Sequence, residues 1–354
     1  MQIRKVMDLA WKLPKWIFEF LSWGKSFKNN PIIGNYWLNR CGLHVARVIL
    51  AHFLFRLRIL LLSPLVSKED RKDFLENGFI LKKDFLPEEQ FSKLSIALKN
   101  YKGVIREIVE GTTLTQRAFM DYSSRQQAPE FCQLVRNSYL DRLMRYSSSK
   151  NRPPFFFIEN LCNHANVAPR PDPQRDMHAD TFHPCVKAWL YIDGTDDQNG
   201  PYIYVPGSHR LSWRRLKWEY RQSLKACQKG VLRDKGRYWD GSFRVNDTAL
   251  AEMGLSAEKL CVPANTLLIA NVYGFHRRGE ASAKSNRMTI WMQARDNPFN
   301  PLFTPCPKYT GRLFEWGWGK ALQRLDKRKI ASGEQNNYLG RFTRNTDRLQ
   351  SHKK

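Results

Sequence analysis

The chain has 354 residues, a formal net charge of +25 and a hydrophobic content of 42%. This length provides for one large catalytic domain with attachments or for two modest domains. The charge indicates an anionic partner, and the choice among nucleic acid, an acidic membrane surface and an anionic substrate stays open. Seven scattered cysteines without a CxxC pair argue against a zinc ribbon or a disulfide framework and favour a reducing compartment.

Residues 1–66 differ in composition from the rest of the chain, with ten Lys and Arg against two acidic residues. Their first part predicts a basic amphipathic helix, because polar residues recur at spacings of three and four on one narrow stripe: Arg4, Asp8, Lys12, Lys15, Glu19 and Ser22. The remaining surface is apolar and rich in tryptophan. A helix of this kind is suited to lie in a membrane interface.

Residues 44–66 come nearest to a membrane span, but we do not predict a transmembrane helix there. Arg47, Arg56 and Arg58 each cost roughly 2.5–3.5 kcal/mol near the centre of a span. Two interpretations of residues 1–66 remain open. They form either a membrane-interfacial segment or a helical layer that packs on the following domain.

The pattern from residue 67 to residue 300 is that of a globular domain. It predicts a helix that ends at 77–78, a short strand at 79–81 and a helix over 87–98. Short strands are expected at 155–158, 185–193, 201–205, 266–272 and 287–293. We therefore expect an α+β chain around an all-β barrel or sandwich with flanking helices.

Two basic regions interrupt or follow this domain. Residues 211–240 form a basic insertion, which is either a solvated helix face or a wall that attracts an anionic substrate. Residues 301–354 form a basic C-terminal tail that ends in a polar stretch with the composition of a disordered segment.

The stretch from Asp176 to His183 contains a pattern typical of metal ligands, His178-Ala179-Asp180. On a β-strand, residues i and i+2 point to the same face, so His178 and Asp180 can meet at one point. Two histidines and one carboxylate form the facial triad that leaves three positions open on Fe(II). His-x-Asp alone is weak evidence, because it arises often by chance.

A third ligand and an anion-binding group follow later in the chain. His276 supplies the second imidazole, close before a predicted strand that begins with Arg287. Arg287 and Thr289 share one face of that strand. A fixed guanidinium can bind a carboxylate through two hydrogen bonds, and a neighbouring hydroxyl can add another.

The ordered set of motifs resembles the phytanoyl-CoA dioxygenase family of Fe(II)/2-oxoglutarate oxygenases. It comprises His178-x-Asp180, the string Asn199-Gly-Pro-Tyr-Ile-Tyr-Val-Pro-Gly-Ser-His209, His276 and Arg287. The segment from Phe74 to Pro87 is similar to the opening of that family. The resemblance covers roughly residues 70–297, and the first 66 residues, the insertion and the tail lie outside it.

The resemblance implies a double-stranded β-helix, or jelly roll, with helical supports. It implies iron ligation by His178, Asp180 and His276, and binding of 2-oxoglutarate by Arg287 with help from Thr289. Trp189 matches a family tryptophan near the cosubstrate. The hydroxyl that some members carry after the distal histidine is absent, because Arg277 follows His276 here. The implied reaction is hydroxylation of an unactivated C–H bond with O2, which yields succinate and CO2.

Three further residues are candidates for the substrate pocket. His183 lies three residues after Asp180, and Lys187 and Tyr191 share the face of Trp189 on the predicted strand 185–193. Structural roles remain the alternative for each of them. His209 ends a Pro-Gly-Ser-His turn, where it is expected to stabilise the backbone rather than bind metal.

The sequence thus predicts a cytoplasmic dioxygenase, peripheral on the inner face of a membrane, that uses Fe(II), 2-oxoglutarate and O2. Its expected substrate is a small or lipid-linked anionic molecule, such as a glycolipid. The alternative is a non-catalytic basic jelly-roll module that binds nucleic acid or an anionic membrane. Spread-out basic residues and the absence of a recognised nucleic-acid motif argue against nucleic acid.

Overall fold

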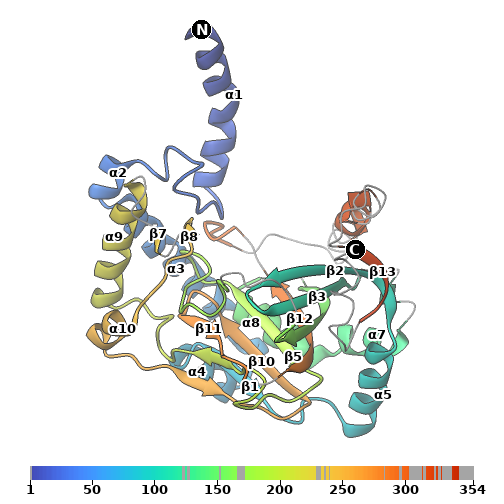
Figure 1. Ribbon diagram of the computed structural model, residues 1–354. Helices are drawn as coiled ribbons and strands as arrows, with labels where there is room; N and C mark the ends of the chain where they lie inside the picture. Colours follow the sequence, from blue (N-terminus) through green and yellow to red (C-terminus); the bar gives the residue numbers. More distant parts are fainter. Residues whose placement is uncertain are drawn as a thin grey trace.

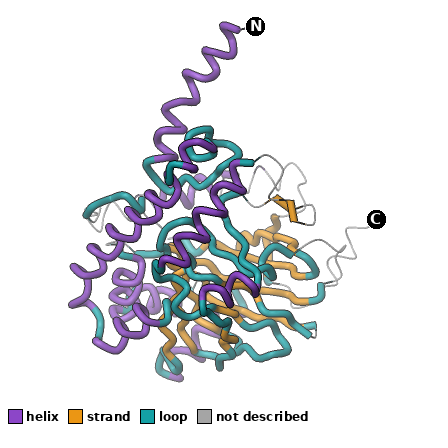
Figure 2. The backbone as a smooth tube through the Cα atoms, turned by 90° about the vertical axis from the view of Figure 1, so that its left-hand side faces the viewer, coloured by secondary structure: helices purple, strands orange, loops and turns teal. Residues whose placement is uncertain are grey.

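The computed structural model describes residues 2–302 except 122–123, 126–127, 151–152, 166–171, 229–232, 235–236, 239, 283 and 295–296. Beyond residue 302 it describes only 313, 316–322, 324–325, 328 and 337–342. Helices and strands lie in separate layers, with strands in the centre (Figures 1 and 2).

The helices occupy mainly the first half of the chain. They are α1 (Gln2–Phe20), α2 (Tyr36–Arg40), α3 (Leu43–Leu62), α4 (Lys68–Glu76), α5 (Glu88–Lys99), α7 (Pro129–Val135), α8 (Ser138–Ser148), α9 (Trp213–Cys227) and α10 (Asp247–Met253). Side-chain caps fix several of the starts. For example, the Ser67 side chain accepts a hydrogen bond from the amide of Asp70 and begins α4. The predicted helix that ends at 77–78 and the predicted helix over 87–98 are confirmed as α4 and α5.

Most strands belong to one antiparallel sheet of eight, in the order β1-β10-β5-β12-β4-β3-β2-β13. Their bounds are β1 (Phe79–Lys82), β2 (Lys102–Glu110), β3 (Thr113–Phe119), β4 (Phe155–Asn163), β5 (Val186–Tyr191), β10 (Thr266–Asn271), β12 (Ser285–Ala294) and β13 (Asn337–Arg341). A second sheet has the order β11-β6-β9, from β11 (His276–Arg278), β6 (Tyr202–Tyr204) and β9 (Glu258–Leu260). A small hairpin pairs β7 (Arg233–Asp234) with β8 (Arg237–Tyr238).

The main core lies between the helices and one face of the eight-stranded sheet. Alternation along β5 sends Val186, Ala188 and Leu190 into this core, where they meet helical side chains such as Phe131 of α7 and Leu143 of α8. The opposite face of β5 looks toward the three-stranded sheet, where a second cluster of aromatic and aliphatic residues lies. Two facing antiparallel sheets with helices on one outer face form the expected double-stranded β-helix.

The N-terminal helices lie against this body in different ways. Helix α1 projects away from it (Figure 1), and its residues from Trp11 onward are largely exposed. Helix α3 packs along the body and buries Val48, Ala51, Phe55 and Ile59. No helix within the described part of the chain is both long and apolar enough to span a membrane.

The structure corrects one expectation from the sequence and adds detail to two others. His178 is not in a regular strand but in isolated bridges to Arg244 and His276. The described part of the basic insertion includes α9, whose Arg215 is buried rather than solvated. The tail contributes β13, which pairs with β2 and extends the large sheet; residues 343–354, where disorder is expected, lie outside the described part.

Candidate metal centre and its cavity

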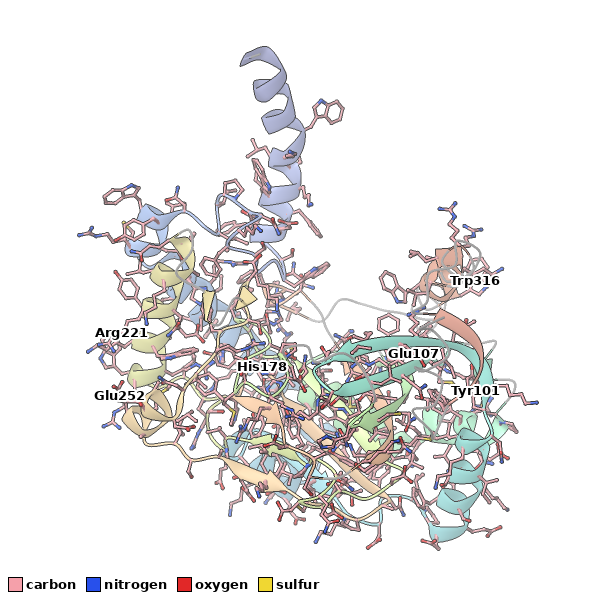
Figure 3. The ribbon with its side chains drawn as sticks, viewed as in Figure 1. Tyr101, Glu107, His178, Arg221, Glu252 and Trp316 are labelled. Atoms are coloured by element: carbon pink, nitrogen blue, oxygen red, sulfur yellow. The ribbon has the colours of Figure 1, made fainter. Side chains whose placement is uncertain are left out.

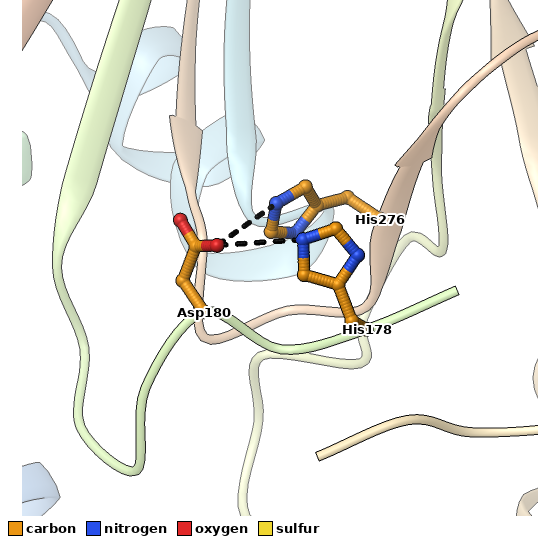
Figure 4. Close-up of side chains that lie close together, drawn as sticks. All are labelled: His178, Asp180 and His276. Carbon is orange, nitrogen blue, oxygen red and sulfur yellow. Dashed lines mark ion pairs between the residues drawn. The ribbon is translucent and has the colours of Figure 1, made fainter. Parts of the chain in front are cut away.

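The side chains of His178, Asp180 and His276 lie close together (Figure 4). The Nε2 atoms of His178 and His276 lie 3.4 and 3.8 Å from Oδ1 of Asp180. Two backbone hydrogen bonds of ordinary length join the histidines, because the amide of each one donates to the carbonyl of the other. His178 and Asp180 therefore point to one place, as their spacing of two residues predicts, although His178 lies in an isolated bridge and not in a regular strand.

Backbone carbonyls orient both imidazole rings. Nδ1 of His178 donates to the carbonyl of Asp176 at 2.7 Å, and Nδ1 of His276 donates to that of Gly274 at 2.9 Å. A carbonyl can only accept, so both Nδ1 atoms carry the proton and both Nε2 lone pairs remain free. This arrangement is the one that metal-binding histidines require.

The electrostatics of the site favour a charged carboxylate beside a neutral ring. Burial, reinforced by His178, lowers the pKa of His276 to about 3. Burial by itself would raise the pKa of Asp180, but Lys187 and the two histidines outweigh it and hold that pKa well below its ordinary value. The Lys187 ammonium lies 2.6 Å from Oδ2 of Asp180.

The donor set fits a divalent metal ion. Bonds of about 2.1 Å at right angles place neighbouring donor atoms about 3 Å apart. The observed donor atoms all lie within 4.8 Å of one another, so small side-chain rotations suffice to reach that geometry. Among the described residues this is the one group of His, Cys, Asp and Glu with such spacing.

A cavity of about 320 Å³ opens beside this centre and is lined by His276. Four predicted residues contribute to its wall: Lys187, Trp189, Tyr191 and Arg287. The alternation predicted for β5 explains the first three, since they share the face opposite the main core. In Figure 3, His178 lies in the middle of the molecule, between the helices on one side and β2 on the other.

Arg287 has the features of a carboxylate-binding group. It is buried, one of its NH2 groups donates to the carbonyl of Gly200, and its Nε–H has no hydrogen-bond partner among the described residues. A buried donor without a partner is costly, so an acceptor from a ligand is expected here. The residues present thus fit 2-oxoglutarate as well as a metal ion.

Two predicted residues are not brought to the cavity wall. His183 is buried beside Pro184, to whose carbonyl its Nδ1 lies at 3.0 Å, and it does not line the cavity. Thr289 is buried on the Arg287 face of β12, without a hydrogen-bond partner for Oγ1 within the described residues. It too lies outside the cavity lining.

Other lining residues were missed from the sequence. Tyr202 and Trp291 line the cavity, and the alternation along β6 and β12 could have revealed both. The Tyr202 ring lies beside the His276 ring in a tilted arrangement, with ring centroids 5.6 Å apart. Arg117 comes from β3, where the sequence offers no motif; it pairs with Glu159 at 2.6 Å and lies over the Trp291 ring.

Residues outside the β-helix brace the ligand segments from behind. The Lys25 ammonium donates to the carbonyl of Asp180 at 2.6 Å. Arg215 of α9 donates to the carbonyl of Tyr273 and lies 3.8 Å from the Phe275 ring centroid, immediately before His276. The carboxylate of Glu219 neutralises Arg215 and accepts a hydrogen bond from His44 of α3 at 2.9 Å.

A double-stranded β-helix that brings two imidazoles and one carboxylate together defines a class, the non-haem metal oxygenases. The family model of phytanoyl-CoA dioxygenase (PhyH) matches residues 74–281. The chain therefore belongs to the phytanoyl-CoA dioxygenase family, whose enzymes depend on Fe(II) and 2-oxoglutarate. No curated protein matches the chain.

Several solved structures are similar to the chain at low identity. The non-heme alpha ketoglutarate dependent epimerase SnoN from nogalamycin biosynthesis is 13% identical with a TM-score of 0.43, over 65% of this chain and 82% of that one. HygX from Streptomyces hygroscopicus, with nickel and 2-oxoglutarate bound, is 14% identical with a TM-score of 0.41, over 64% and 86%. AviO1 from Streptomyces viridochromogenes Tue57 is 17% identical with a TM-score of 0.40, over 69% and 99%.

Proposed function

We propose that the protein hydroxylates an unactivated C–H bond of an anionic substrate. His178, Asp180 and His276 would hold Fe(II), and Arg287 would bind the distal carboxylate of 2-oxoglutarate. When bound, the iron and 2-oxoglutarate together activate O2, so that one oxygen atom enters the substrate and the other enters succinate as CO2 leaves. The meeting of the three ligand side chains beside a buried arginine supports this proposal most strongly.

The presence of Asp180 favours hydroxylation over halogenation, because related halogenases replace this carboxylate with a small residue. Lys187 keeps the carboxylate charged before metal binds, so the site is ready for a cation. The enclosed position of the ligands, with His178 and His276 both buried, keeps bulk water from the reacting centre.

The cavity wall indicates a polar substrate with ring-like, hydroxylated parts. Two ion pairs line it, Arg117 with Glu159 and Arg278 with Glu110 at 2.8 Å, together with aromatic rings such as Trp189. Paired charges offer hydrogen bonds, whereas an acyl chain would leave them unused. Arg277 has no carboxylate partner among the described residues and is free for an anionic group of the substrate. An anionic glycolipid headgroup has this chemistry.

We further propose that residues 1–66 hold the enzyme at the inner face of an anionic membrane, where a lipid-linked substrate would lie. The exposed apolar side chains of α1 and of the turn after it, among them Trp11, Phe18 and Trp23, support this placement. In the same proposal, residues 67–300 form the dioxygenase domain, with a basic insertion at 211–240 and a basic tail at 301–354.

Conversion of 2-oxoglutarate to succinate tests the reaction. The purified protein should form succinate only with Fe(II) present, and Asp180→Ala should reduce the rate at least about 100-fold, because a metal ligand is lost. Glu252→Ala is the matched control, since Glu252 is exposed on α10 and far from His178 in Figure 3. Equal succinate formation by Asp180→Ala and the control would refute the proposal.

A further inference from the structure

A second cavity lies on the other side of the metal-ligand loops, between α3, α4 and the segment after β6. Its volume is about 260 Å³, slightly below the usual range for sites that enclose a whole small molecule and sufficient for a small headgroup. Polar residues at its wall include His52, Arg56, His209 and Arg210. None of these residues takes part in the metal centre or its cavity.

The two histidines carry unused hydrogen-bonding capacity. His52 and His209 are each 7% exposed, and neither Nε2 of His52 nor Nδ1 of His209 has a hydrogen-bond partner among the described residues. Burial and, to a smaller extent, the positive charge of Arg210 lower the pKa of His209 to about 4, so the ring is neutral at pH 7. As a neutral imidazole, His52 can donate from Nε2 to an anion without adding charge repulsion toward the arginines, whereas His209 already donates to the carbonyl of Leu75 and its Nδ1 can only accept.

The two arginines make the cavity electropositive. Neither Arg56 nor Arg210 forms an ion pair with a carboxylate in the part of the chain that the structure describes. Both lie close enough to His209 to depress its pKa, and every charge that acts on this ring is positive. Cations without counter-ions beside an enclosed apolar wall favour an anionic ligand.

The rim of the cavity is apolar and continues along an exposed helix face. Ile49, Phe53 and Leu75 line the cavity, and Phe53 is 63% exposed. Toward the end of α3 the same exposed face continues with Leu57, Leu60 and Leu61. A soluble protein rarely leaves so many large apolar side chains in water along one helix unless that surface binds something.

We propose that this cavity binds the phosphate headgroup of an anionic membrane lipid, with Arg56 and Arg210 on the phosphate and the exposed face of α3 against the acyl chains. This inference deepens the proposed membrane contact of residues 1–66 and is independent of the proposed reaction. A phosphate without acyl chains would satisfy the two arginines but would leave the apolar rim in water.

Vesicle flotation tests this inference with the full chain. Phosphatidylcholine vesicles with and without phosphatidylglycerol are compared for the wild type, Arg56→Gln/Arg210→Gln and the control Arg214→Gln/Arg221→Gln. The control lowers the net charge equally, and both of its arginines are exposed on α9. The cavity variant should reduce partitioning onto phosphatidylglycerol vesicles roughly 30-fold, the contribution of two cations near an anionic surface. The control should change it far less, and circular dichroism melting verifies that both variants are folded.

The outcomes separate this inference from the proposed membrane contact. Failure of the wild type to bind either vesicle would refute the membrane contact itself. Equal losses in both double variants, or no loss in the cavity variant, would overturn the cavity inference alone. Protection against melting by inorganic phosphate that depends on Arg56 and Arg210, without vesicle binding, would assign the cavity to a soluble anion and overturn the lipid assignment.

Discussion

The strands of the β-helix and the helix α3 differ in how they distribute charged and apolar side chains. Strand β5 buries Val186 and Leu190 and leaves its polar residues on the cavity side. Helix α3 buries apolar residues such as Phe55, but it also buries Arg47 and Arg58, each 5% exposed, and leaves Phe53 and others in solvent. The burial along β5 is that of a strand in a folded core. Helix α3 packs on the domain with one face and leaves a second apolar face that lacks a partner in the described part of the chain.

Each buried arginine of α3 is used to attach the helix to the body. Arg47 donates to the carbonyl of Gly24 at 2.8 Å and lies 4.2 Å from the ring centroid of Phe182. Arg58 donates to the hydroxyl of Ser149 at 3.1 Å. These arginines therefore anchor α3 on the domain, and the apolar face that remains is the one proposed to meet a membrane.

The largest expected effect comes from removing the layer altogether. Deleting residues 1–66 takes Phe55, Ile59 and Leu62 out of the main core, and each buried side chain of this kind contributes about 1.5–3 kcal/mol. Their sum approaches the whole stability of an ordinary domain, about 5–15 kcal/mol. We expect no folded monomer after this deletion. Deletion of residues 1–12 is the control, and the melting temperature of this shorter protein should match that of the wild type. A folded, active protein that lacks residues 1–66 would contradict a structural role of α3.

The next largest effect is expected at the link between α3 and α9. Glu219→Gln leaves Arg215 buried without a counter-ion, which should cost about 3–5 kcal/mol of unfolding free energy in a urea titration. Glu252→Gln, on the exposed side of α10, should cost almost nothing. The double variant Arg215→Met/Glu219→Leu should recover much of the loss, because it removes both charges. If the double variant is no more stable than Glu219→Gln, the loss comes from packing rather than from the uncompensated charge.

A smaller effect is expected from pH. Burial alone would raise the pKa of Glu219, but Arg215 and His44 outweigh it and lower that pKa below its ordinary value of 4.5. The unfolded chain therefore binds a proton at Glu219 more readily than the folded chain does. Stability from this group is present above pH 4.5 and is lost as the pH falls below it. In urea titrations, the difference in stability between wild type and Glu219→Gln should shrink in that range; a constant difference would contradict the assignment.

The meeting of the three proposed metal ligands could be predicted because their signal in the sequence is local and ordered. His178 and Asp180 are two residues apart, and the order of His276 and Arg287 after them matches one family. The wall residues on β5 followed from simple alternation. Arg117 could not be found, because a single arginine on β3 becomes part of the cavity only when β3 pairs with β4.

The orientation of α3 was beyond prediction from the sequence. The cost of placing its arginines in a membrane excludes a spanning helix, but it does not reveal which of these arginines face the domain. Contacts from Ser149 and Phe182, more than 90 residues away, decide that orientation. The burial of Arg215 and Glu219 could not be predicted either. Two opposite charges four residues apart on a helix fit an exposed ion pair equally well.

Equilibrium dialysis of Fe(II) under anaerobic conditions tests the central claim most directly. The wild type and Glu252→Ala should each bind one Fe(II) per chain, and binding should tighten when 2-oxoglutarate is present. Asp180→Ala and His276→Ala should weaken Fe(II) binding at least about tenfold, because each removes a ligand. Undiminished Fe(II) binding by both ligand variants would contradict the account, since the iron would then lie elsewhere in the chain.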